Sequence, residues 1–186
     1  MRGRFPCATH LIIACELKSD AERVMEILPK RFGRFGLSLN KEKSKLVPFM
    51  RPGLKSRKGS GTFNFLGFTF YWGRSRKGVP LPKVKTTGKR LRAKLKAVNA
   101  WGRMIRSRHR LNYIWAVFCA KLRGHIQYYG VSFNTRAVHT FLNKATRILF
   151  KWLNRCSQRR SFSWDRFTLF IEANPLPQVT VCHALF

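Results

Sequence analysis

Apolar and polar residues follow different periods in different parts of the chain. Near the N-terminus, the short apolar run at residues 10–15 predicts a buried strand, and residues 44–50 predict a second one. Between them, Ser19 and Glu22 have the spacing of a capping box, which predicts a helix that starts there and ends near Gly33 or Gly36. A strand, a helix and a strand are typical of a fragment of an α+β domain.

The middle of the chain predicts a loop and a β-hairpin. Residues 51–61 are rich in Gly, Lys, Arg and Ser, which favours an irregular basic loop. Residues 63–71 alternate well enough for one strand. The turn at residues 73–78 would return that strand through residues 79–84, which completes the hairpin.

From Thr86 onward the apolar period becomes helical. A first helix carries apolar residues every three or four positions, and further helices are predicted at residues 112–129, 135–155 and, shorter, 163–171. Gly130 suits the end of the second helix. The apolar stripe of the first helix is Leu91, Leu95, Val98, Trp101 and Ile105.

The sequence therefore predicts a mostly α fold. We expect a basic three-helix bundle at residues 86–173, preceded by a truncated α+β remnant at residues 1–50 and by the basic loop and β-hairpin at residues 51–85. Residues 174–186 form a tail. At 186 residues the chain is long enough for one domain, or for one domain and part of another.

Charge narrows the range of partners. The chain has 38 Lys and Arg residues against 7 Asp and Glu residues, a net charge of +31, and no carboxylate lies between Lys43 and Trp164. A phosphate backbone is the partner that such a surface favours. No apolar run approaches the ~18 residues of a spanning helix or forms a signal-peptide core, so we expect a soluble cytoplasmic protein that does not bind a membrane.

The cysteines predict neither a disulfide framework nor a zinc site. There are five, an odd number, and no two of them are spaced as Cys-x-x-Cys. We interpret them as small apolar residues of a reducing compartment.

Several ordered motifs in the chain carry a resemblance to one known family. Residues 36–46 (GLSLNKEKSKL) and 65–68 (FLGF) are similar to the end of the palm domain of group II intron reverse transcriptases. Residues 122–130 (LRGHIQYYG) resemble the signature of its maturase domain, also called domain X or the thumb. Residues 151–160 (KWLNRCSQRR) and 162–164 (FSW) match the usual end of that domain. The resemblance implies a palm remnant joined to a thumb that binds group II intron RNA.

The chain departs from this family where the polymerase chemistry would take place. The Tyr-Ala-Asp-Asp tetrad of the family aligns with residues 7–10 (CATH), so Thr9 and His10 stand where the resemblance places the aspartates. Two-metal polymerisation needs anionic oxygen ligands for Mg²⁺. We therefore expect no Mg²⁺ site, no cofactor and no autonomous polymerase activity. The endonuclease segment of the family is also expected to be missing.

Three groups of residues are candidates for RNA binding, and none is a candidate for catalysis. The basic faces of the first helix are either phosphate ligands or solubilising surface. At the end of the second helix, only one of two adjacent tyrosines can point inward, which leaves the other free to stack on a base. Arginines that follow the third helix are further phosphate ligands. The candidates are Lys85, Lys89, Arg90, Arg92, Lys94, Lys96, Arg123, His125, Tyr128, Tyr129, Arg155, Arg159 and Arg160.

The leading functional hypothesis is a maturase-like protein that binds group II intron RNA and assists its folding and splicing. DNA, bound without sequence preference, and a separate reverse-transcriptase chain are further candidate partners. One alternative is the C-terminal part of an RNA-directed DNA polymerase, active only with a separate fingers and palm chain. Another is a degenerate intron-encoded remnant whose N-terminal strands expose unpaired edges.

Overall fold

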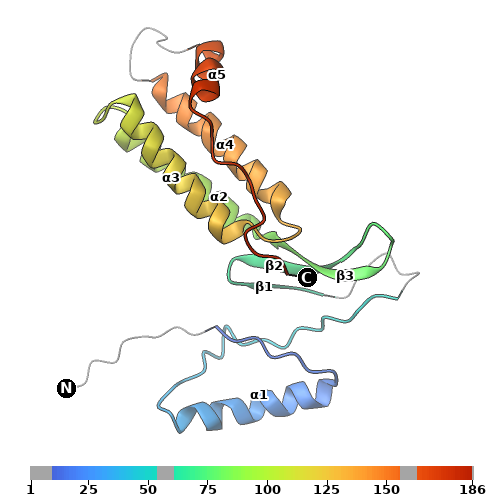
Figure 1. Cartoon of the computed structure of the whole chain (residues 1–186). Coiled ribbons are helices and arrows are strands. Elements are labelled where there is room, and N and C mark those ends of the chain that lie inside the picture. The colour runs from blue at the N-terminus through green and yellow to red at the C-terminus, as the bar shows by residue number, and fades with distance from the viewer. Residues whose placement is uncertain (1–9, 54–60, 156–162, 186) are drawn as a thin grey trace, which may run out of the picture.

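The computed structural model describes residues 10–53, 61–155 and 163–185. The fold is mostly helical, with one small antiparallel sheet that lies between the helical bundle and helix α1 (Figure 1). The elements are α1 (Lys18–Gly33), β1 (Thr62–Phe65), β2 (Phe68–Arg74), β3 (Pro80–Thr86), α2 (Gly88–Ile105), α3 (Leu111–Tyr129), α4 (Thr135–Leu153) and α5 (Trp164–Ala173).

The two strands predicted near the N-terminus are wrong. Residues 10–15 and 44–50 are extended but belong to no strand, and apolar side chains along them are exposed, Leu11 at 58% and Met50 at 69%. The physical reason is that an extended segment becomes a strand only beside another strand that pairs with its backbone, and no described segment pairs with either one.

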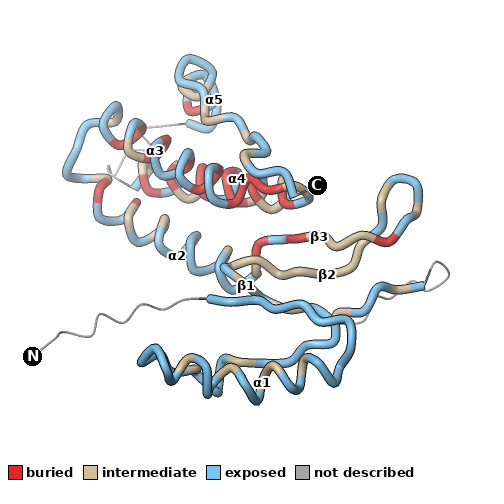
Figure 2. Tube along the Cα trace, turned by 60° about the horizontal axis from the view of Figure 1, so that its bottom comes forward, coloured by how far each residue is buried: buried red, intermediate tan, exposed pale blue. Residues whose placement is uncertain are grey.

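Helix α1 forms, but not in the predicted way. It begins at Lys18, and its N-cap residue Leu17 makes no side-chain cap hydrogen bond, so the predicted capping box is wrong. Glu22 instead lies with Oε1 3.3 Å from Nζ of Lys18, one turn earlier. No residue of α1 is buried, and Figure 2 shows exposed or half-buried residues along its whole length.

The sheet has the order β1-β2-β3, one strand more than the predicted hairpin. Residues 63–71 are broken by a two-residue turn, in which Leu66 and Gly67 have φ of 48° and 84°. Positive φ at both positions matches the right-handed twist of the flanking strands and permits a tight hairpin. The second turn lies between β2 and β3, as the sequence predicts. Phe70 pairs with Phe63 on one side and with Val84 on the other.

The three-helix bundle is confirmed, and its core lies among α2, α3 and α4. Thr87 caps α2 by accepting a hydrogen bond from the backbone N–H of Arg90. The apolar stripe predicted for α2 packs against the buried residues of α3 and α4. Gly102 lets α2 approach α4 closely, because a Cβ there would lie 2.8 Å from Cδ1 of Trp152.

Asn134 joins the sheet to the bundle. It is almost fully buried, and its Oδ1 accepts from the backbone N–H of Thr86 at 2.7 Å, while its Nδ2 donates to the carbonyl of Tyr129 at 2.8 Å. One amide therefore connects the end of β3, the end of α3 and the start of α4. A buried amide satisfied in this way fixes the orientation of the elements that it bonds.

Candidate nucleic-acid interface

The basic residues of α2 lie on two sides of the helix. Lys89, Arg92 and Lys96 are exposed, and their spacing of three and four positions places them on one face, opposite the apolar stripe. Arg90 and Lys94 lie on the flank nearer the end of α3, where their charges act on Tyr129 and His125. Lys85 is also exposed, and its Nζ lies 5.0 Å from the ring centroid of Tyr71.

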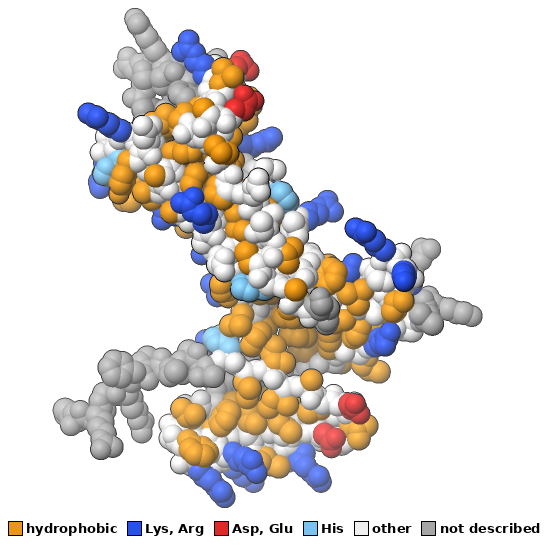
Figure 3. Space-filling view, viewed as in Figure 1, with side chains coloured by type: hydrophobic (Ala, Val, Ile, Leu, Met, Phe, Trp, Pro, Cys, Tyr) orange, Lys and Arg blue, Asp and Glu red, His pale blue; other side chains and the backbone are white. Residues whose placement is uncertain are grey.

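Positive charge is not confined to α2. Lys121 and Arg123 are exposed on α3, and so are Lys144 and Arg147 on α4. On the face that Figure 3 shows, basic side chains lie at many places, whereas acidic groups lie near α5 and near α1. In the part of the chain that the structure describes, the single ion pair joins Lys18 to Glu22, so the bundle is a polycation without internal charge compensation.

His125 is buried, so the prediction that it contacts RNA directly needs correction. The ring is 6% exposed, stacked against Phe141 with centroids 3.7 Å apart and 4.6 Å from the centroid of Tyr129. Neither ring nitrogen has a hydrogen-bond partner. Burial, and secondarily the charge of Lys94, lowers the pKa of His125 to about 4, so the ring is neutral at pH 7.

The two adjacent tyrosines face in different directions, and Tyr129 is the inward one. Tyr129 is buried in the core, and burial raises its pKa. Tyr128 is 49% exposed, yet its hydroxyl donates to the carbonyl of Leu66 at 2.9 Å and its ring is stacked on Phe68. Both tyrosines therefore hold the first hairpin against the bundle, and only part of the Tyr128 ring is open to a ligand.

The last glycine of the LRGHIQYYG segment also has a structural role. Gly130 ends α3 with a φ of −73°, so it is not required for a left-handed conformation. A Cβ at this position would lie 2.5 Å from the carbonyl oxygen of Ile126 and 2.6 Å from that of Thr180. Gly130 thus allows the C-terminal segment to pass close to the end of α3.

A second cationic cluster lies at the far end of the bundle, around Trp152. The cationic groups of Arg106, Lys151 and Arg155 lie 5.2, 5.8 and 5.2 Å from the Trp152 ring. The indole Nε1 donates to Asn99, and a guanidinium nitrogen of Arg106 donates to the carbonyl of Arg155 at 2.7 Å. We call Arg106, Lys151 and Arg155 the Trp152 cluster.

Of the residues predicted in this region, the structure places Arg155 alone. Arg159 and Arg160 lie outside the described residues, as does Thr9. Arg106 and Lys151 were missed by the sequence reasoning, because Arg106 and Arg155 are 49 positions apart. The sequence contained one weak signal for them. Arg106 and Lys151 both lie near the C-terminal end of a helix, where the helix dipole favours a cation.

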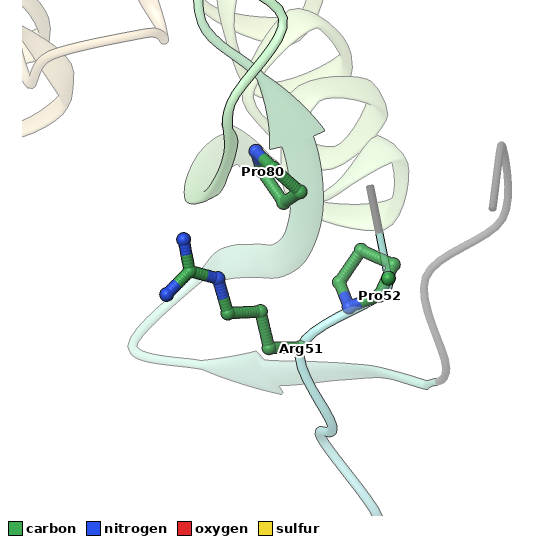
Figure 4. A pocket seen from close by; sticks show the side chains of 4 residues that line it. Arg51, Pro52 and Pro80 are labelled. Carbon is green, nitrogen blue, oxygen red and sulfur yellow. The ribbon is translucent and has the colours of Figure 1, made fainter. Parts of the chain in front are cut away.

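Two pockets in the described part of the chain lie beside the elements discussed above. One, of about 380 Å³, lies where Arg51 and Pro52 approach Pro80 at the start of β3 (Figure 4). The other, of about 360 Å³, lies between α3 and the C-terminal segment and includes Arg123. In the same residues, no three His, Cys, Asp or Glu side chains are grouped so that they could hold a metal ion. None of the described helices has the length and apolar character needed to span a bilayer.

Comparisons of this chain with protein families, with curated proteins and with solved structures found no match. The described residues offer a ligand three features. These are a bundle surface rich in Lys and Arg without acidic partners, the exposed part of the Tyr128 ring, and a pocket at the end of α3.

Proposed function

We propose that this protein binds structured RNA, and specifically group II intron RNA, as a maturase-like protein that assists RNA folding and splicing without autonomous polymerase activity. The observation that carries the proposal is the absence of any carboxylate from α2, α3 and α4, whose exposed Lys and Arg side chains have no acidic partner within the bundle. The motif resemblance adds the identity of the RNA. The proposed site of action is the cytoplasm.

The mechanism is neutralisation of phosphate charge. Each basic side chain that reaches a phosphate releases a condensed counterion, which favours binding and makes it depend on salt. An RNA fold brings helices together against their mutual repulsion, and a cationic bundle between them reduces that repulsion. The exposed face of α2 and the Trp152 cluster would contact separate phosphate groups. Lys96 and Lys89 precede Arg106 along the helix, at a rise of ~1.5 Å per residue, by roughly 15 and 25 Å.

Binding titrations at several salt concentrations test this function. The full chain would be titrated against a group II intron RNA and against an unrelated RNA duplex of the same length. The proposal predicts tighter binding to the intron RNA, with a difference that persists when salt is raised. Equal affinities and equal salt slopes for the two RNAs would reduce the activity to nonspecific binding of a polycation.

A second candidate function rests on the exposed N-terminal segment. Leu11, Ile12 and Ile13 are all about half exposed, and α1 buries no residue, which favours completion of this unit by another chain. In that case the protein is the C-terminal part of a split RNA-directed DNA polymerase. Primer extension that appears only on mixing with a fingers and palm chain would support this alternative, and no extension in the mixture would eliminate it.

A further inference from the structure

The C-terminal segment, residues 174–185, is attached to the end of α3 by backbone hydrogen bonds. It runs from α5 along the bundle toward the sheet (Figure 1). The N–H groups of Cys182 and His183 both donate to the carbonyl of Gly130, at 2.6 and 3.1 Å. Val131 and His183 form a parallel bridge, and Nε2 of His183 lies 2.9 Å from the carbonyl oxygen of Gln127. The segment therefore forms a preformed wall beside α3.

The pocket of about 360 Å³ lies between this wall and α3. Its volume is within the ~300–1,000 Å³ range of small-ligand sites. Arg123 and Gln127 line it from α3, and Gln178, Pro175 and Pro177 line it from the segment. The side chains of Arg123, Gln127 and Gln178 make no hydrogen bond to the described part of the chain, so their donors and acceptors are available to a ligand.

The composition of the lining selects among ligand classes. A phosphate group alone favours several cations, and this pocket has one, Arg123. A proline-rich peptide favours a groove lined by aromatic rings, and no aromatic residue lines the pocket. An unpaired nucleobase has two flat faces and a donor–acceptor edge. The rings of Pro175 and Pro177 offer an apolar surface to one face. The amides of Gln127 and Gln178 suit the edge.

We propose that this pocket binds a single unpaired nucleobase of the RNA. The inference rests on the proposed RNA-binding function and adds base recognition to it. The proline rings contact a face of the base, the two amides bond to its edge, and the Arg123 guanidinium pairs with the flanking phosphate. Since no carboxylate lines the pocket, nothing competes for Arg123 or repels the nucleotide.

The test uses two RNA hairpins and the full chain at one salt concentration. One hairpin has a single bulged 2-aminopurine, and in the other the same base is paired. We expect the bulged hairpin to bind about tenfold more tightly, a difference of about 1.4 kcal/mol. Binding should also change the 2-aminopurine fluorescence. Adenosine monophosphate should reverse that change, and ribose 5-phosphate should not.

Substitutions in the pocket test whether its amide side chains cause the preference for the bulged hairpin. The double substitution Gln127→Ala and Gln178→Ala should abolish the preference for the bulged hairpin while leaving the affinity for the paired hairpin unchanged. Asn112→Ala, which removes an exposed amide at the other end of α3, is the matched control and should keep the preference. Circular dichroism of each variant checks that the helices are retained, as expected for exposed side chains without hydrogen-bond partners.

The outcomes separate this inference from the function on which it rests. Equal binding of both hairpins by the unaltered chain would overturn the base pocket and leave RNA binding intact. Preference retained by the double variant, or reversal by ribose 5-phosphate as efficiently as by adenosine monophosphate, would also overturn it. Binding of neither hairpin nor of intron RNA would instead refute the proposed function.

Discussion

His125 shows how the burial of one residue decides its protonation. Because the ring lies between Phe141 and Tyr129 and its nitrogens have no partner, the charged form is unfavourable in the folded chain. The pKa is about 4 when folded, against 6.5 for an unperturbed histidine. Between pH 6.5 and pH 4 the unfolded state binds more protons than the folded state. The free energy of unfolding therefore has its full value above pH 6.5 and decreases as the pH falls to 4.

The free energy of unfolding should therefore decrease by about 3 kcal/mol between pH 7 and pH 4 through this residue. His125→Phe, which keeps a ring between the two aromatic neighbours, should remove most of this pH dependence. Urea unfolding at several pH values measures it. His139→Gln is the control, because His139 is exposed on α4. A pH dependence that is the same in His125→Phe as in the unaltered chain would contradict the assignment.

Gly124, within α3, and Gly130, at its C-terminal end, should respond oppositely to substitution by alanine. In Gly130→Ala the new methyl group would overlap the carbonyl oxygens of Ile126 and Thr180, so we expect a loss of about 1–3 kcal/mol of stability. Gly124 has no atom within 4 Å of an added Cβ. Gly124→Ala should therefore stabilise the helix by about 1 kcal/mol. Thermal melting of both variants checks this, and equal shifts would show that the C-terminal segment does not pack against Gly130.

Charge on a single helix face, the outer face of α2, should dominate RNA binding. The triple substitution of Lys89, Arg92 and Lys96 by Gln removes three charges from the outer face of α2. The matched triple of Arg136, Lys144 and Arg147 by Gln removes three from the exposed side of α4. The α2 triple should reduce the slope of log affinity against log salt by about 2–3, and the α4 triple should leave it nearly unchanged. Equal losses in the two triples would mean that no face is preferred.

The helices were largely predictable from the sequence, and the sheet was less so. Helical periodicity is local, so the ends of α2, α3 and α4 fall within about two residues of their expected positions. The break at Leu66 was missed, because a residue other than glycine or asparagine at positive φ gives little turn signal. The predicted strands at residues 10–15 and 44–50 failed because strand formation depends on a neighbour rather than on local pattern.

The candidate site was predictable in its charge and in the burial of one of two adjacent tyrosines. The exposed basic residues of α2 follow from composition and helical spacing, as does the inward position of one of Tyr128 and Tyr129. The Trp152 cluster and the pocket at Arg123 join segments about 50 residues apart in the chain. Their existence depends on how α2, α3 and α4 pack and on the path of the C-terminal segment, which no local pattern contains.

For the molecule as a whole, the N-terminal segment and the bundle differ in how they are stabilised. The buried apolar residues all come from β3 onward, whereas α1 buries nothing. Phe49, which follows α1, is different, because its ring packs against Phe63 and is stacked on Trp72 of the sheet. A boundary in stability, rather than in connectivity, should therefore lie between α1 and Phe49.

Deletion of residues 1–43 locates that boundary. It removes α1 and five of the seven acidic residues, but keeps Phe49 and the whole sheet. Because burial of apolar surface supplies most of the folding free energy, we expect the melting temperature to change by less than about 4 °C. Phe49→Ala in the full chain should cost more, roughly 2–4 kcal/mol for a partly buried ring. A deletion that lowers the melting temperature further than Phe49→Ala does would mean that α1 packs against the sheet after all, and that the stability of the bundle depends on the N-terminal segment.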